Sequence, residues 1–189
     1  MSQVATTVCY QIDEGASQFT VKAFASGLIS VVAHSPTFAI REVAGEITFE
    51  PGTLAQAAVW VAINPAGLQL KDEVSSEDRK IIDTVMHHEV LESSKYPNIT
   101  FESRRTAATK LGENLYRVSI VGDLSLHGVR RQVTLHAQTV VGEDTIRAIG
   151  DFTILQTDFG MNIISVAGST LRLKDELKLG FFIIARRRV

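Results

Sequence analysis

Residues 95–103 read Lys-Tyr-Pro-Asn-Ile-Thr-Phe-Glu-Ser, and the pattern of the chain changes within this stretch. Pro97 disfavours helical backbone at the residue before it, so a helix is expected to end upstream of this point. Ile99 and Phe101 then place apolar side chains at every second position, which is typical of a strand with one buried face. The stretch therefore predicts the junction between a helix and a series of β-hairpins.

The segment before this junction has the period of a helix. Ser75 is followed three residues later by Asp78, as in a capping box, and Glu77 adds negative charge at the positive end of the helix dipole. The apolar side chains recur at helical spacing and form one broad stripe: Ile81, Ile82, Val85, Met86 and Val90. We expect a helix over about residues 76–91.

Period two dominates the rest of the chain. Short polar or glycine-containing stretches interrupt it at residues 110–114, 127–128 and 142–144, and connections this short require antiparallel neighbours. The pattern predicts about eight strands, with the helix inserted between the third and the fourth. An open sheet of this size exposes two edges, which closure removes. The expected fold is therefore all-β with one inserted helix, an antiparallel barrel of about eight strands.

The last expected strand, over about residues 175–185, is apolar on both faces. Leu179 and Phe181 point one way, whereas Phe182 and Ile184 point the other. A strand with this pattern is expected to be covered on both sides. One face would line the barrel interior, and the other would meet the helix or a second subunit.

The composition describes one globular domain. The chain has 189 residues, 45% of them hydrophobic and 21% charged, with a formal net charge of -2. This balance gives no electrostatic reason to expect nucleic acid as a partner. We expect a single domain over residues 1–189, with its core at about 10–186. The three consecutive arginines at 186–188 are expected to form a short solvated tail.

No disulfide, signal peptide or membrane-spanning segment is expected. Cys9 is the single cysteine, so no internal disulfide can form. The first nine residues lack the basic and apolar regions of a signal peptide. No apolar run approaches about 18 residues, the length that a membrane-spanning helix needs. These features predict a cytoplasmic protein.

The titratable residues form no recognisable catalytic or metal-binding motif. The five histidines are His34, His87, His88, His127 and His136. No HxH, HExxH or CxxC spacing occurs, and the chain has no G-x-S-x-G elbow and no phosphate-binding glycine loop. We therefore expect no metal, no cofactor and no catalytic residue. His127 is expected to bond loop backbone beside Gly128 in a tight turn.

The apolar faces of the strands are expected to point into the barrel. The expected lining is Phe19, Val21, Ile47, Phe49, Val61, Ile99, Phe101, Val118, Ile120, Val133, Phe152, Leu179 and Phe181. An eight-stranded barrel is just wide enough to be filled by side chains or to hold one small ligand, and the alternation is compatible with both. Gly45, Gly122 and Gly150 stand at inward positions, where glycine favours added space, a sharp bend or a bulge.

Several blocks of the chain resemble the YceI-like family. The blocks are Ser-Gln-Phe-Thr-Val at 17–21, the stretch at 95–103, Gly-Asp-Leu-Ser-Leu-His-Gly-Val-Arg-Arg-Gln-Val at 122–133, and Thr-Asp-Phe-Gly-Met at 157–161. They occur in the family's order, and the resemblance runs from about Tyr10 to Arg186. The chain departs from the family in lacking a secretion signal and in a more elaborate stretch at residues 33–42.

The resemblance implies a lipocalin-like barrel that binds a polyisoprenoid or a related long-chain lipid. By this interpretation the chain is a non-enzymatic carrier or sequestering protein for an isoprenoid or acyl lipid, with the lining above as its tunnel. His127, Arg131 and Asp158 lie at loop ends and are the candidates for contacts with a head group. Two alternatives stay open. One is a filled barrel that acts as an interaction module through a homodimer, and the other is an enzyme on a lipid-like or quinone-like substrate, for which no residue signature exists.

Overall fold

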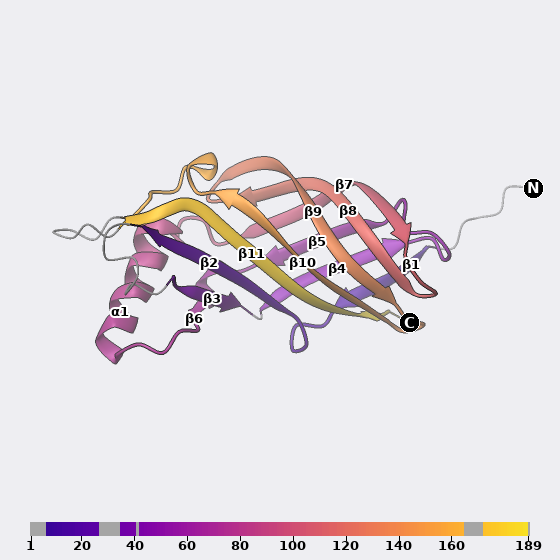
Figure 1. Cartoon of the computed structure of the whole chain (residues 1–189), viewed down its shortest axis with the longest axis horizontal. Coiled ribbons are helices and arrows are strands. Elements are labelled where there is room, and N and C mark those ends of the chain that lie inside the picture. Colours follow the sequence, from indigo (N-terminus) through magenta and orange to yellow (C-terminus); the bar gives the residue numbers. More distant parts are fainter. Residues whose placement is uncertain (1–6, 27–34, 41, 165–171, 189) are drawn as a thin grey trace, which may run out of the picture.

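The computed structural model describes residues 7–26, 35–40, 42–164 and 172–188, and the described chain is dominated by β-strands (Figure 1). The strands are β1 (Val8–Ile12), β2 (Gln18–Ser26), β3 (Thr37–Ile40), β4 (Val43–Phe49), β5 (Ala58–Ile63), β6 (Gln69–Leu70), β7 (Ile99–Lys110), β8 (Leu115–Leu126), β9 (Val129–Val141), β10 (Thr145–Leu155) and β11 (Arg172–Arg187). The helical elements are η1 (Pro65–Gly67), α1 (Ser76–Val85), the π-helical turn η2 (Met86–Val90) and η3 (Thr157–Phe159). Residues 33, 34 and 41 of the elaborate stretch, His34 among them, lie outside the described residues.

The strands close into an eight-stranded antiparallel barrel. The pairing runs β1-β4-β5-β7-β8-β9-β10-β11, and β1 also pairs with β11 to complete the ring. This is the fold expected from the sequence. The remaining segments extend three of its walls, because β2 pairs with β3 and β3 with β6, just as β1 pairs with β4 and β4 with β5. Each of these walls is therefore one strand broken into two, which is why there are more segments than the expected eight.

The turns between the long strands fall where the sequence places them. His127 and Gly128 form the two-residue turn between β8 and β9, with φ values of 52° and 74°. Positive φ at both central positions matches the right-handed twist of the flanking strands. Residues 111–114 and 142–144 make the other two tight connections.

The inward glycines make room for aromatic rings. A methyl group on Gly122 would lie 2.5 Å from Cζ of Phe101, and one on Gly150 would lie 2.5 Å from Cζ of Phe181. The sequence left open whether these glycines provide space, a sharp bend or a bulge. Gly122 and Gly150 provide space, which side chains from neighbouring strands fill. The aromatic rings of Phe101 and Phe181 are thus tightly packed inside the barrel, and a residue larger than glycine at position 122 or 150 would clash with them.

Helix α1 begins as the capping box predicts and ends earlier than expected. The Ser75 hydroxyl accepts a hydrogen bond from the Asp78 backbone N–H at 3.0 Å. The α-helical part stops at Val85, and Met86–Val90 form a π-helical turn instead of the last helical residues. Arg79 ties the helix to the barrel, because its guanidinium donates to the carbonyl oxygens of Leu70 and Asp72, both at 2.8 Å.

The three arginines near the C-terminus are exposed, as expected, but they do not form a tail. β11 continues to Arg187, where it pairs with Tyr10 of β1, so the first two of the three arginines belong to the strand. The Nε of Arg186 donates to Oδ2 of Asp13 at 2.6 Å. These residues are part of the strand because they pair with β1, and this pairing closes the barrel. β11 is also longer at its start, since it begins at Arg172.

A charged cluster joins three neighbouring strands on the outside of the barrel. Asp123 on β8 is 6% exposed and accepts hydrogen bonds from Nε of Arg104 at 2.8 Å and from Nε of Arg130 at 2.9 Å. Arg104 stands where the register between β7 and β8 shifts. Its hydrogen bond is the largest cause that lowers the pKa of Asp123; burial opposes this effect, and the hydrogen bond from Arg130 adds to it.

We expect replacement of Asp123 by asparagine to lower the free energy of unfolding at neutral pH and to matter less in acid. Because the carboxyl pKa is lower in the folded than in the unfolded chain, its stabilisation is present above about pH 4 and is lost as the pH falls through the folded value. Urea unfolding of both proteins at pH 7 and at several acid pH values measures the difference. A gap between wild type and Asp123→Asn that stays constant with pH would contradict this account.

Candidate functional site

The main cavity of the barrel lies at its helix end. It has a volume of about 370 Å³ and is enclosed by α1, η2, the ends of the strands and the loop after η3. In Figure 1, α1 lies at this end of the barrel, opposite the end where the C-terminus is marked. β7 pairs with β5, whereas β6 pairs with β3. The sheet therefore lacks a pairing between β6 and β7 among the described strands, and α1 covers the opening that results. We call this space the helix-end cavity.

The lining of the helix-end cavity is almost entirely hydrocarbon. Among the described lining residues, the polar ones are Thr20, Asp72 and Gln156. The Asp72 carboxylate accepts a hydrogen bond from the Thr37 backbone N–H at 2.6 Å, and the Gln156 amide donates to the Lys174 carbonyl oxygen at 2.9 Å. The Thr20 hydroxyl donates to the Gly180 carbonyl oxygen at 3.4 Å, so all three polar groups are engaged with backbone. The cavity offers an environment that favours apolar matter over water.

Helix α1 covers this cavity with its apolar stripe. Ile82, Val85 and Met86 line the cavity, and Ile81 lines its rim with 61% of its surface exposed. No residue of α1 itself is buried. A helix normally buries such a stripe in a packed core. Here the stripe forms the roof of a cavity.

A second, smaller cavity lies deeper in the barrel. Its volume is about 120 Å³, and the residues around it include Phe101, Ile120, Phe152 and Phe181. We call it the inner cavity. The far end of the barrel is closed below it, where Tyr10 stacks on Phe49 with ring centroids 5.5 Å apart. The interior is therefore neither filled throughout nor an open tube.

The structure places the expected lining residues inside the barrel. Every one of them lies in the buried core or packs against it. All but Phe49 and Val133 line one of the two cavities. Binding of a ligand by these side chains remains a prediction, whereas their direction is a feature of the fold.

A buried histidine clamps the segment after the roof helix to the barrel. Nδ1 of His127 lies 3.2 Å from the Phe159 carbonyl oxygen, and Nε2 lies 2.8 Å from Oε2 of Glu92. The ring of His127 thus bridges the backbone of η3 and the side chain of Glu92. The ring also packs on Tyr96, with centroids 4.4 Å apart.

The charge on Glu92 fits this arrangement. Burial raises the pKa of the carboxyl, but hydrogen bonds from His127 and Lys95 outweigh it, so the pKa lies below its usual value. Glu92 also has a φ of 42°, an uncommon backbone conformation for a residue with a side chain. The contact with His127 holds this segment beside the β8–β9 turn.

The three candidates for head-group contacts come together at the helix end, but none lines the cavity. His127 bonds the backbone of η3, as the sequence led us to expect of a residue in this turn. Nε of Arg131 donates to the Asp158 carbonyl oxygen at 3.1 Å. Their part in ligand binding stays a prediction. Sequence periodicity did not identify Asp72 or Gln156 as lining residues, because both lie in irregular segments.

The outer face of β11 is not covered by α1. Phe182 on this face is 37% exposed, so the helix does not supply the expected cover, and cover by a second subunit stays a prediction. The helix instead lies across the end of the barrel.

Neither metal-ligand clusters nor membrane-spanning helices are seen in the described part of the chain. No group of three histidine, cysteine, aspartate or glutamate side chains comes together there. His87 lies near Ser93, with Nδ1 3.4 Å from the hydroxyl oxygen, and His136 lies on the outer face of the barrel. None of the described helices has the length and apolar character needed to cross a bilayer.

One known protein family matches nearly the whole barrel. The YceI-like domain matches residues 10–185. The chain belongs to this family. The match covers all of the barrel strands except the ends of β1 and β11. A comparison with curated proteins found no match.

Solved structures share the fold of this YceI-like protein at low sequence identity. BcnA of Burkholderia cenocepacia is 20% identical, with a TM-score of 0.68 over 92% of this chain and 98% of that one. A polyisoprenoid binding domain from Saccharophagus degradans is 12% identical, with a TM-score of 0.66 over 95% and 98% of the two chains. The YceI protein of Campylobacter jejuni is 18% identical, with a TM-score of 0.59 over 80% and 85%. These likenesses establish a shared fold.

We expect His127→Leu to loosen the segment that follows the roof helix while the barrel stays folded. The change removes both hydrogen bonds of the ring and leaves Glu92 without its buried partner. Amide hydrogen exchange in residues 86–96 should become several-fold faster, whereas exchange in β8 and β9 should stay slow. Ser94→Ala, at an exposed position in the same loop, is the control. Unchanged exchange in His127→Leu would show that the clamp does not hold this segment.

Proposed function

We propose that this YceI-like protein binds a long-chain apolar lipid, of the polyisoprenoid or acyl class, in the helix-end cavity. The observation that carries the proposal is a cavity of about 370 Å³ with an almost wholly apolar lining inside a closed barrel. Its volume lies within the usual range of ligand sites, about 300–1,000 Å³. Membership of the YceI-like family and the shared fold of a polyisoprenoid binding domain support this choice of ligand class.

A linear hydrocarbon suits this site because burial alone supplies the affinity. Each methylene moved from water into the cavity contributes about 0.8 kcal/mol. A chain also needs no directional contacts, and the lining offers few. The polar end of such a lipid would stay near the rim, at the end of the barrel where His127, Arg131 and Asp158 lie.

The roof helix gives a route by which cargo enters and leaves. No residue of α1 is fully buried, and Arg79 holds the helix to the barrel through two backbone carbonyl oxygens. Displacement of the roof would expose the cavity without breaking the strand pairing that closes the barrel. We therefore propose carriage or sequestration of the lipid, with the lipid released chemically unchanged.

We expect Ile82→Lys to weaken lipid binding by about tenfold or more, because it places a charge against an apolar ligand. Thr84→Lys, exposed on the same helix and outside the lining, is the matched control and should bind as wild type does. The measurement is native mass spectrometry of freshly purified protein, followed by extraction of bound molecules and titration of the emptied protein with prenols and fatty alcohols. Failure of the wild type to hold any apolar chain would overturn the proposal.

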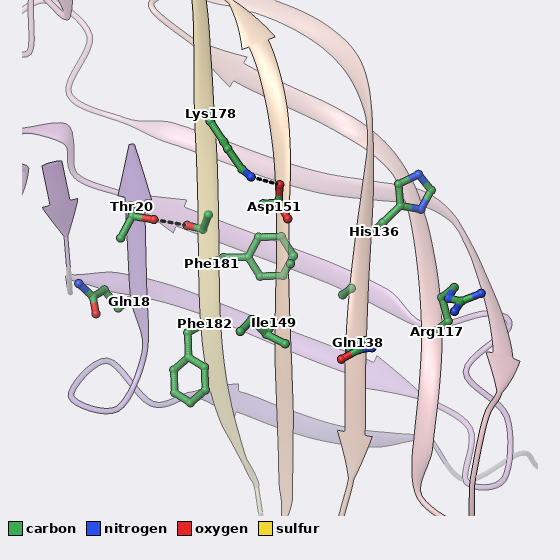
Figure 2. A pocket seen from close by; sticks show the side chains of 13 residues that line it. Gln18, Thr20, Arg117, His136, Gln138, Ile149, Asp151, Lys178, Phe181 and Phe182 are labelled. Carbon is green, nitrogen blue, oxygen red and sulfur yellow. Dashed lines mark hydrogen bonds and ion pairs between the residues drawn. The ribbon is translucent and has the colours of Figure 1, made fainter. Parts of the chain in front are cut away.

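A second candidate function rests on the outer face of β10 and β11. Ile149 and Phe182 are direct cross-strand neighbours, point outward and are 53% and 37% exposed. Figure 2 shows them side by side in a groove on the outside of the barrel, with the ion pair of Lys178 and Asp151 beyond them. We propose that a second copy of the chain covers this patch. In a two-fold interface the same patch meets itself, so Lys178 and Asp151 would each find an opposite charge.

We expect Phe182→Asp to shift this homodimer toward monomer, raising its dissociation constant by about tenfold or more. Sedimentation velocity over a range of protein concentrations measures the shift. Thr145→Asp adds the same charge to an exposed position of β10 away from the patch and serves as the control. A wild-type protein that stays monomeric at high concentration would rule out the homodimer.

A further inference from the structure

Five residues lie at the boundary between the helix-end cavity and the inner cavity. Each lines both cavities, and each comes from a different strand: Phe19 of β2, Ile63 of β5, Ile99 of β7, Leu124 of β8 and Leu179 of β11. We call this ring of side chains the collar. β5, β7 and β8 are neighbours in the barrel, as are β11 and β2, so the collar residues border the passage between the cavities from two groups of strands, with none from β9 or β10.

Phe19 differs from the other members of the collar. It is the one aromatic residue among the five; like Ile63, Ile99 and Leu179 it is partly buried, whereas Leu124 is buried. Its neighbour Phe181 is buried, with the two ring centroids 6.1 Å apart. Phe181 is held over Gly150, whereas nothing comparable fixes Phe19 among the described glycine contacts. Phe19 is therefore the ring that can obstruct or open the passage.

We propose that Phe19 sets the chain length of the cargo. The inference rests on the proposed lipid binding and adds the residue that selects among lipids. A linear chain that enters under the roof helix runs down the helix-end cavity and ends against the Phe19 ring. The inner cavity beyond it, about 120 Å³, stays without cargo in the wild type.

The collar makes affinity depend on chain length in a specific way. Each further methylene that is buried raises affinity about fourfold, so affinity should climb steeply with length while the chain grows toward the collar. Once the chain end meets Phe19, a longer chain must leave its extra methylenes at the rim, and the climb should stop. Removal of the Phe19 phenyl group joins the two cavities. The inner cavity, of about 120 Å³, has room for roughly four groups of the size of a water molecule, which occupies about 30 Å³ in the liquid, and a methylene is of similar size.

The test is a titration of emptied protein with linear primary alcohols of increasing chain length. In the wild type, affinity should rise with length and then reach a plateau. In Phe19→Ala the plateau should move to chains longer by roughly four carbons, with a gain in affinity of about tenfold or more for those chains. Phe19→Leu should give a smaller shift in the same direction. It also serves as the test variant if the alanine substitution prevents folding, as judged by circular dichroism.

Val21→Ala provides the matched control. Val21 lies two residues along β2 and lines the helix-end cavity, but it does not line the inner cavity. Its truncation widens the helix-end cavity and leaves the collar intact, so the affinity plateau should stay at the wild-type chain length.

The outcomes separate this proposal from the one on which it rests. If the wild type binds none of the alcohols, lipid binding fails and the role of Phe19 fails with it. If the wild type binds them but the plateau is the same in Phe19→Ala and Phe19→Leu, lipid binding stands and the collar does not measure length. A plateau that moves equally in Val21→Ala would also overturn the proposal, because cavity volume alone would then explain the shift.

Discussion

Closure of the ring by β1 and β11 is the constraint on which the rest of the structure depends. The pairing is short, from Tyr10 with Arg187 to Ile12 with Ala185, and it joins the two ends of the described chain. Without it the sheet would expose two edges, and the inward side chains would have no opposite wall to pack against. Both cavities exist because the ring is closed, and the order of the last arginines follows from the same pairing.

The two ends of the barrel are built differently. At the far end, Tyr10 stacks on Phe49 and donates a hydrogen bond to the Glu143 carbonyl oxygen at 3.0 Å, which seals the interior with side chains. At the helix end, the roof is a separate element held by Arg79 and by the clamp at His127. Access to the interior is therefore expected from the helix end. A bound lipid chain would then lie with its polar end toward α1 and its apolar end toward the far end of the barrel.

The sequence was sufficient for features that depend on neighbouring residues. Alternation placed residues such as Phe101 and Leu179 on the inner face, and the turn at His127 and Gly128 came from its residue types. The sequence was insufficient where partners are distant along the chain. β3 and β6 are too short to show a period and form only because β2 lies beside β3. Likewise, the exposure of Phe182 and the role of Asp72 depend on where α1 comes to lie, which no local pattern encodes.

The broken walls divide the barrel into two halves with different tolerance for change. From β7 to β11 the strands are long, and tight turns join β7 through β10, so an insertion within them would shift the register of a whole wall. The other half is already interrupted, between β1 and β2, between β3 and β4, and between β5 and β6. A residue gained or lost at these interruptions alters only a short pairing. Related chains can thus acquire cavities of new shape through this half, while the continuous half preserves the barrel during that divergence.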